Sequence, residues 1–467
     1  MPVKKHVKKA PLRFAAGALT VILLFLSLIS CGCEEIFERE VLSKEQLSEN
    51  ISGEDGGWDT VARYLYEWDF PTFNDEKFLA VEKCVEAYYC GEMPGKHEVA
   101  VTCGNLFLEY FYDGVNLKSS SEVTDALLTC YMASYGDGFA SYRNADAYSD
   151  FMGEMSGEEK FVGIGVRVRK SIEGMPYVVS VINGSPAELA GLKRGDVIVE
   201  VDGFSASEEG DKGYEKTVSR ISGLEGETVS ITVERAGKRL TFTPERRAVG
   251  DATVIYSLDG ATGYGLVEIL SFKEKTDEDF KAAIDALVLA GAKGIIFDLR
   301  SNLGGILPTV VNMISYLVDD GLPVVSYKCK NTPEVRLNSG SDGHAVKLPM
   351  VVITNELTAS AAEIFAASLR DYELMEGVEL DVTIVGKKSL GKGVMQRVYS
   401  FSDGSAVTVT VAYYNPPLGI NYHGVGVMPD DEVEDELSVS GGDAQLLAAF
   451  EAMGELISAS SAQGISN

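Results

Sequence analysis

The stretch that decides the fold of the C-terminal half reads Gly294-Ile295-Ile296-Phe297-Asp298-Leu299-Arg300-Ser301-Asn302-Leu303-Gly304-Gly305. It opens with a short apolar run, which is typical of a strand buried on both faces. Two adjacent glycines follow, and then an apolar helical pattern through Val310, Val311, Ile314 and Leu317. Such a turn can point backbone N–H groups at an anion, with the positive end of a helix dipole behind them. An oxyanion hole is the functional interpretation, and a plain tight turn is the alternative.

Strands alternate with helical segments on both sides of this stretch, from about Thr253 onward. Residues 263–269 read as a strand, and an amphipathic helix is predicted over Thr276 to Leu289 because apolar residues recur there at helical intervals. Alternation of this kind favours an α/β domain with a sheet covered by helices.

A serine stands at the next turn from strand to helix. The strand Met350 to Thr354 leads through Asn355-Glu356-Leu357 into Thr358-Ala359-Ser360-Ala361-Ala362-Glu363, where a helix is predicted to start. A serine in this position lies at the sheet edge near helix N–H groups, which is the geometry that a nucleophile needs. On spacing alone, the helix N-cap is the simpler interpretation.

A nucleophilic serine needs a base, and outside the leader the chain has only His97, His344 and His423. A Ser-His-Asp triad is therefore poorly supported, and we interpret His423 as a loop side chain. Lys392 lies between two glycines on the loop after a further strand, and burial can lower the pKa of a lysine until its neutral amine acts as a base. Gln396, four residues later, can orient that amine without adding charge.

A small β-rich domain precedes these elements. Short alternating strands begin near Phe161, and the segment Gly184 to Asp196 between two of them carries a helix-cap serine and turn glycines. This pattern resembles a PDZ domain, in which a peptide adds as an extra strand and a glycine-containing loop holds its carboxylate. The resemblance implies four peptide-binding residues, Gly163, Ile164, Gly165 and Val166. The alternative is that these glycines only allow a tight entry into a strand.

The first thirty residues have the layout of an export signal, with five basic residues before the apolar stretch Phe14 to Ile29. The stretch ends in Leu28-Ile29-Ser30-Cys31, which resembles the lipobox of bacterial lipoproteins and implies lipidation of Cys31; Cys33 is a poorer match. A retained transmembrane helix is the alternative, but this stretch is short for the roughly 30 Å of a bilayer core. We expect an extracytoplasmic protein that is lipid-anchored to a bacterial membrane.

The overall charge excludes one class of partner. The net charge of −29 repels the phosphates of nucleic acid, so no nucleic-acid partner is expected. Four cysteines lie between Cys84 and Cys130, and export permits one or two disulfides there, with the pairing open. A metal site is poorly supported because these cysteines lack a Cys-x-x-Cys pair.

Taken together, the motifs resemble the C-terminal processing (tail-specific) peptidases, which are S41 family serine proteases with a PDZ domain. The likeness covers about Gly136 to Asp430, and Gly424 to Asp430 resembles the last core strand of the family. It implies Ser360 as nucleophile, Lys392 as general base and Gln396 as its orienting partner. It also implies that the oxyanion donors are the backbone N–H groups of Gly304 or Gly305 and of Ala361. This sequence departs from the family at Ala362, where many relatives have a second serine, and in an apparent insertion at residues 372–379.

The expected architecture is α/β and multi-domain, with a ClpP/crotonase-like protease core, an inserted PDZ-like β domain and a helical N-terminal region. The expected boundaries are a lipoprotein signal peptide at 1–30, a tether and helical region at 31–150, the PDZ-like domain at 158–248, the protease core at 249–436 and a helical tail at 437–467.

The expected function is a serine endopeptidase that cleaves exported proteins near their C-termini through an acyl-enzyme, with an apolar substrate tail bound by the PDZ domain. No metal or cofactor is implied. One alternative is a catalytically silent peptide-binding protein on the same scaffold. Another is a crotonase-like acyl-CoA enzyme, which the export signal disfavours. The N-terminal helices and a helix over Gln445 to Met453 could serve as homodimer contacts.

Overall fold

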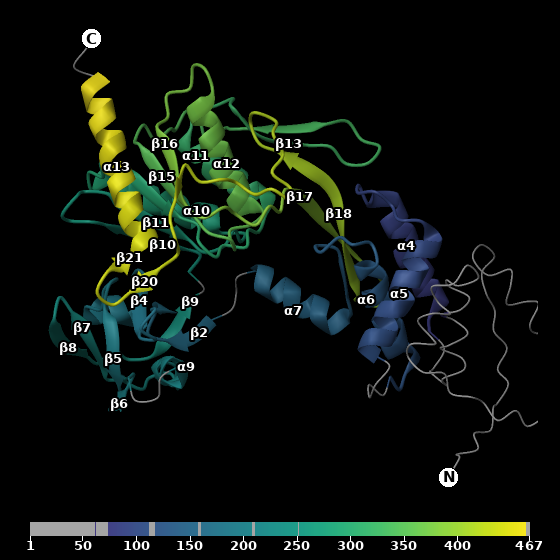
Figure 1. Cartoon of the computed structure of the whole chain (residues 1–467), viewed down its shortest axis with the longest axis horizontal. Helices are drawn as coiled ribbons and strands as arrows, with labels where there is room; N and C mark the ends of the chain where they lie inside the picture. The colour runs from purple at the N-terminus through teal and green to yellow at the C-terminus, as the bar shows by residue number, and fades with distance from the viewer. Residues whose placement is uncertain are drawn as a thin grey trace, which may run out of the picture. The chain divides into compact units, whose positions relative to one another are not determined.

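A computed structural model describes Val61 and residues 73–111, 117–156, 160–207, 211–250 and 252–463 (Figure 1). The export signal, the lipidation candidate Cys31 and the aromatic segment 64–68 lie outside these residues. Two compact units are present: one contains the residues up to Ser149 together with Gln396–Ala412, and the other contains Asp150–Met395 together with the residues from Tyr413 onward. No helix within the described ranges is both long and apolar enough to cross a membrane.

The N-terminal unit is mainly helical, as the sequence predicts. Polar caps begin two of its helices: Asn74 accepts a hydrogen bond from the amide of Lys77, and Ser119 forms a reciprocal capping box with Glu122. Phe78 and Tyr131 pack edge to face in its core, 5.0 Å apart between ring centroids. The elements in this part of the chain are α4 (Asp75–Tyr88), α5 (Lys96–Phe111), α6 (Ser120–Ala133), β1 (Ser141–Arg143) and α7 (Ala145–Ser156).

The expected disulfides are not present among the described residues. Cys84, Cys90, Cys103, Cys130 and Cys329 are all free thiols. Cys103 and Cys130 are buried in neighbouring helices, and the thiol of Cys103 points at the backbone carbonyl of Leu127. Burial raises the pKa of Cys103 well above its ordinary value, so this thiol behaves as a small apolar core residue.

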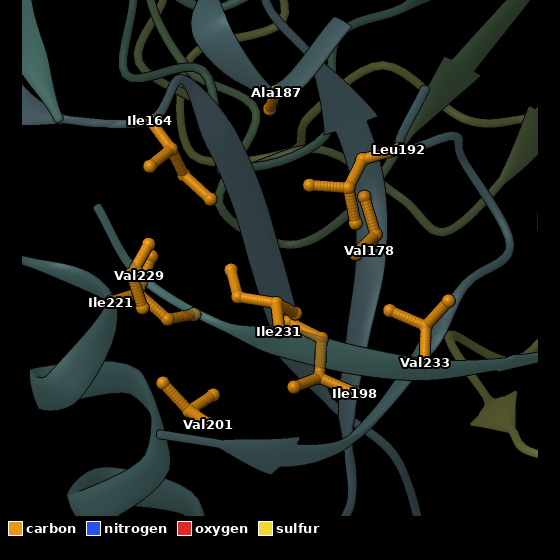
Figure 2. Close-up of a cluster of buried hydrophobic side chains, with 10 residues drawn as sticks. All are labelled: Ile164, Val178, Ala187, Leu192, Ile198, Val201, Ile221, Val229, Ile231 and Val233. Atoms are coloured by element: carbon orange, nitrogen blue, oxygen red, sulfur yellow. The ribbon is translucent and has the colours of Figure 1, made fainter. Parts of the chain in front are cut away.

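The β-rich domain has a five-stranded path in the order β3-β4-β5-β7-β8, with β6 beside β5 and a separate β2–β9 pair. Since β3 has a partner on one side only along this path, it is an edge strand. Figure 2 shows the side chains of its core, which come from the strands, from α8, from the end of α9 and from the segments between these elements. The elements are β2 (Lys160–Gly163), β3 (Val166–Lys170), β4 (Pro176–Val181), α8 (Pro186–Ala190), β5 (Val197–Val201), β6 (Phe204–Ser205), α9 (Asp211–Ile221), β7 (Ile231–Arg235), β8 (Lys238–Phe242) and β9 (Arg247–Gly250).

The C-terminal half forms the predicted α/β domain around a sheet in the order β10-β11-β12-β15-β16-β19. The pair β10–β11 is antiparallel and the other neighbours run parallel. The helix predicted over Thr276 to Leu289 is α10 with those bounds. The elements of this sheet and its covering helices are β10 (Val254–Leu258), β11 (Gly265–Ile269), α10 (Thr276–Leu289), β12 (Ile295–Asp298), α11 (Leu307–Leu317), β15 (Met350–Thr354), α12 (Ala361–Leu374), β16 (Val382–Gly386), β19 (Asp431–Glu432) and α13 (Ala444–Gln463).

Helices cover both faces of this sheet because successive residues of a buried strand point to opposite sides. On one face, Phe297 of β12 contacts Phe280 of α10 and Phe365 of α12, with ring centroids 5.8 and 5.2 Å apart. On the other face, Ile296 belongs to a cluster with Met453 of α13, the helix that runs beside β15 and β16 in Figure 1. The fold class expected from the sequence, mixed α/β, is therefore confirmed.

Four further strands and a small hairpin complete the part of the chain that the structure describes. β13 pairs with β14 on one side and with the last two residues of β18 on the other. In the N-terminal unit, β1 pairs with the first residues of β18. β17 also pairs with β18. These elements are β13 (Pro323–Tyr327), β14 (Val335–Asn338), β17 (Val394–Ser400), β18 (Ala406–Asn415), β20 (Leu437–Ser438) and β21 (Gly442–Asp443).

One predicted strand is wrong. Residues 424–430 are not in a strand; β19, of only two residues, follows them. The physical reason is that Gly424 and Gly426 adopt φ values of 70° and 86°, which belong to the left-handed region and interrupt an extended chain. This segment instead forms a turn beside the loop that carries Lys392.

Candidate active site

Ser360 lies at the N-cap of α12, directly after the turn that leaves the end of β15. Its backbone has φ 57° and ψ −118°, a conformation that a residue with a side chain rarely adopts. Such backbone strain persists only where the surroundings hold it, and it clusters at functional sites. The side chain is half-buried, so it lies within reach of solvent and of a substrate.

Lys392 lies on the loop between β16 and β17 and is also half-buried. The neighbouring glycines are required by the close approach of the turn at residues 422–427. A Cβ on Gly391 would lie 3.0 Å from the backbone nitrogen of Gly426, and a Cβ on Gly393 would lie 2.7 Å from that of His423. The amide of Gly424 also donates to the carbonyl of Gly391 at 2.9 Å. The loop of Lys392 is thus held by tight backbone packing.

A buried carboxylate joins these two segments. Oxygen Oε2 of Glu363 accepts hydrogen bonds from the amides of Ser360 at 2.8 Å and Lys392 at 2.7 Å. Because both amides donate to the same oxygen, their nitrogens lie no more than about two hydrogen-bond lengths apart. Oxygen Oε1 accepts from the amide of Gly391 at 2.7 Å and the hydroxyl of Ser389 at 2.5 Å. Glu363 therefore fixes the distance between the serine turn and the lysine loop.

Burial raises the pKa of Glu363, while the four hydrogen bonds act in the opposite direction. Sequence reasoning missed this residue. The signal that could have found it is the helix-start pattern of a serine followed three residues later by a glutamate, which places that glutamate beside the N-cap.

We expect Glu363→Gln to lower kcat by about 10- to 100-fold in a peptide-cleavage assay while KM changes little. An amide has one accepting oxygen, so its NH₂ group would face two of the four donors that the carboxylate now satisfies. Glu356→Gln, at an exposed carboxylate of the same turn, is the matched control and should leave kcat unchanged. Full activity in Glu363→Gln would contradict a positioning role for the carboxylate.

The glycine turn after β12 lies directly against Ser360. A Cβ on Gly304 would lie 2.7 Å from the Cβ of Ser360 and 2.8 Å from the amide nitrogen of Ala361. Gly304 and Gly305 have φ values of 95° and 148°. The amide of Gly304 donates to the side chain of Asn302 at 2.8 Å. The structure thus brings together Ser360 and the backbone of two of the predicted oxyanion donors, and the third, Gly305, is next in the chain.

The structure also places Gln396 and two of the histidines. Gln396 belongs to the N-terminal unit, where its side-chain amide donates to the carbonyl of Phe139. His344 stacks on Tyr316 with ring centroids 3.7 Å apart. His423 lies on a loop, as predicted, and its amide donates to the side chain of Asn421. Within the described ranges, histidine, cysteine and acidic side chains nowhere form a set that could hold a metal ion.

With the fold and this geometry in hand, known families can be compared. Residues 263–433 match peptidase family S41, and residues 162–244 match the PDZ domain. The carboxy-terminal processing protease CtpA of Bacillus subtilis is 31% identical over 313 residues, which are 67% of this chain and 64% of that protein. Residues 263–433 of the chain belong to peptidase family S41. A CtpA-like serine protease of Staphylococcus epidermidis is 30% identical over 329 residues, 69% of this chain and 64% of the relative.

The alignments therefore span somewhat less than two thirds of the length of these curated relatives. Among solved structures, an S41 protein from Bacteroides fragilis is 17% identical and covers 81% of this chain and 97% of its own, with a TM-score of 0.53. That likeness concerns the fold alone. The family resemblance and the combination of a protease-type α/β core with a PDZ domain, both predicted from the sequence, are confirmed.

The predicted peptide-binding residues of the PDZ domain occupy the break between β2 and β3. Gly163 ends β2 and Val166 begins β3. Gly165 has φ 82°, and a Cβ there would lie 2.3 Å from the Cβ of Ser185. The side chain of Ile164 is buried in the domain core, and its carbonyl accepts from the amide of Ala187 at 2.8 Å. Ile164 therefore packs the domain, and only its backbone and its neighbours are left near the open edge of β3.

A buried cluster of charges lies beneath the S41 site. Arg300 is buried and donates to Asp298 of β12 at 2.6 Å and to Asp443 of β21 at 2.7 Å. Burial disfavours the charged form of Asp298, but the guanidinium of Arg300 outweighs this and lowers the pKa of that carboxyl. From the PDZ domain, Arg167 and Arg194 form ion pairs with Glu268 of β11. Charged groups of both domains thus meet at the carboxyl ends of β11 and β12.

The serine turn is also tied to this cluster. The side chain of Asn355 accepts from the amide of Ser301 at 2.9 Å and donates to Asp435 at 3.3 Å. Asp435 in turn accepts from Arg169 of the PDZ domain at 2.9 Å. Asn355 had no role in the sequence reasoning, and no pattern in the chain marks it. A continuous set of polar contacts therefore runs from β3 of the PDZ domain to the turn before Ser360.

Proposed function

We propose that this chain is a serine endopeptidase of the C-terminal processing type, with Ser360 as nucleophile and Lys392 as general base. The observation that carries the proposal is the shared carboxylate of Glu363, which holds the backbones of Ser360 and Lys392 against one another. If Ser360 only capped α12, the fold would have no need to hold a lysine loop beside it. The strained backbone of Ser360 gives further support.

In the proposed reaction, the neutral amine of Lys392 takes the proton of Ser360 Oγ as this oxygen attacks the substrate carbonyl carbon. The negative charge that develops on the carbonyl oxygen is stabilised by backbone N–H groups of the glycine turn and of Ala361. For the amide of Gly304 to take part, its hydrogen bond to the side chain of Asn302 would have to break. The amide of Gly305 would not have to break this bond. Lys392 then returns the proton to the leaving amine, and water hydrolyses the acyl-enzyme. Gln396 is proposed to orient the amine.

The PDZ domain is proposed to present the substrate. An apolar C-terminal tail would add to the open edge of β3, with its carboxylate at the backbone of Gly163 and Gly165. Exported proteins are the proposed substrates, because the leader has an export layout and the segment that ends in Cys31 resembles a lipobox. The enzyme would act outside the cytoplasm, anchored to the membrane by its lipid.

The test uses residues 34–467 and two unfolded reporter proteins that differ only in an apolar or a twice-charged C-terminal tail. We expect cleavage of the apolar-tailed reporter at least about tenfold faster, since a charged tail would lose hydration in an apolar site. Product masses would place the cuts near the C-terminus. Tight binding of the apolar tail without any cleavage would instead identify a peptide-binding protein and contradict the proposal.

A further inference from the structure

Exposed leucines gather on the loops that carry the proposed catalytic groups. Leu303 precedes Gly304, Leu357 lies on the turn before Ser360, and Leu390 is two residues before Lys392. Their exposed fractions are 68%, 54% and 48%. A single exposed leucine needs no explanation, but a group of them beside a functional site is typical of a binding surface.

The three loops are joined by backbone hydrogen bonds, so the segments that carry these leucines lie side by side. The amide of Ala359 donates to the carbonyl of Asn302, and the amide of Leu390 donates to the carbonyl of Thr358, both at 2.9 Å. The loops leave the carboxyl ends of three adjacent parallel strands, β12, β15 and β16. This edge is where ligands of parallel α/β sheets generally bind.

The turn at residues 422–427 lies beside the last of these loops. Val425 is 59% exposed, and its amide nitrogen lies 3.2 Å from where a Cβ on Gly391 would be. Exposed charges on these loops, at Glu356 and Lys388, are farther along the chain from Ser360 and Lys392 than the leucines are. Among the exposed side chains of these two loops, Leu357 and Leu390 are therefore nearer in sequence to the proposed reacting groups than the charges are.

We propose that Leu303, Leu357 and Leu390 form a subsite that selects apolar substrate side chains next to the scissile bond. The inference rests on the proposed endopeptidase function and adds a second selection, made by the S41 core rather than by the PDZ domain. We expect an extended peptide that crosses Ser360 to pass over these leucines. An apolar side chain gains by leaving water with them, whereas a charged one loses its hydration.

The experiment first maps the cuts that residues 34–467 make in β-casein, an unfolded protein, by mass spectrometry. Two quenched fluorescent peptides are then built around one mapped cut, with leucine or lysine beside the scissile bond. The wild-type chain should prefer the leucine peptide, and Leu390→Asp should lower the ratio of kcat/KM for leucine over lysine by at least about tenfold. Leu357→Asp, a second variant on another loop, should shift the ratio in the same direction.

Leu289→Asp is the matched control, because it also places an acid at an exposed leucine. Leu289 is 90% exposed at the end of α10, before β12 begins and thus at the opposite edge of the sheet. The ratio of kcat/KM for the leucine peptide over the lysine peptide should be the same in Leu289→Asp as in the wild type. Circular dichroism of each variant checks the fold.

An unchanged ratio in both Leu390→Asp and Leu357→Asp would overturn the subsite, as would an equal loss of activity toward both peptides in folded variants. With either of these outcomes, the proposed function would still stand if the wild-type chain cleaves the peptides and Ser360→Ala does not. A wild-type chain that cleaves neither β-casein nor the peptides would overturn the proposed function and the subsite together.

Discussion

Ser360→Ala is expected to lower kcat/KM for peptide cleavage by at least about 10⁴-fold, since removal of a serine nucleophile leaves only binding and oxyanion stabilisation. The competing interpretation is that Ser360 only caps α12. Ser119→Ala is the matched control for that role, because Ser119 caps α6 by a reciprocal capping box. This control should lose about 1 kcal/mol of stability and keep its activity. If Ser360→Ala also keeps its activity and loses only stability, as Ser119→Ala should, Ser360 is not the nucleophile.

The partner substitution at Lys392 belongs to the same prediction. Lys392→Ala should be as inactive as Ser360→Ala, and the double variant should be no worse than either, because the two groups act as one unit. Lys392→Arg should also be inactive, since a guanidinium stays protonated and cannot accept the serine proton. Lys388→Ala, on the exposed part of the same loop, is the control and should retain activity. A fully active Lys392→Arg would show that this residue is not the base.

Arg300→Ala is expected to lower the free energy of unfolding of the S41 core by about 3–5 kcal/mol. The substitution leaves the carboxylates of Asp298 and Asp443 buried without their guanidinium, and an uncompensated buried charge is costly. The measurement is urea unfolding followed by circular dichroism. Because the pKa of Asp298 is held low by Arg300, protonation of Asp298 at acidic pH should reduce the difference between variant and wild type.

Arg336→Ala provides the comparison for this second prediction. Arg336 is 73% exposed and pairs with the partly exposed carboxylate of Glu334, so its loss should change the free energy of unfolding by no more than about 0.5 kcal/mol. Equal effects of Arg300→Ala and Arg336→Ala would mean that the buried cluster contributes no more than a surface ion pair.

Local patterns in the sequence predicted the elements that local chemistry determines. The helix Thr276 to Leu289 follows from its apolar periodicity, and α8 follows from the cap at Ser185 and the turn at Gly191. The position of Ser360 at the start of a helix follows from the strand before it. In each case the residues that decide the structure lie within one or two turns of chain.

Contacts between distant segments could not be read in this way. Arg300 meets Asp443 from 143 residues away, and Asn355 meets Asp435 from 80 residues away. The segment 424–430 was predicted as a strand because it resembles the last core strand of the family. The structure turns it into a loop because its glycines pack on the backbone of the Lys392 loop. The roles of Ser360 and Lys392 are predictions that the assays above test, and the role of Gln396 is a prediction as well.

The same turn, residues 422–427, also bears on when the site can form during synthesis. Ser389 and Val427 exchange hydrogen bonds in both directions, and Gly424 donates to Gly391. A ribosome makes this turn last among the segments that surround Ser360 and Lys392. A nascent chain that ends before residue 427 therefore lacks the support of its lysine loop, and we expect it to be inert. The proposed protease would become competent only after this turn has been made.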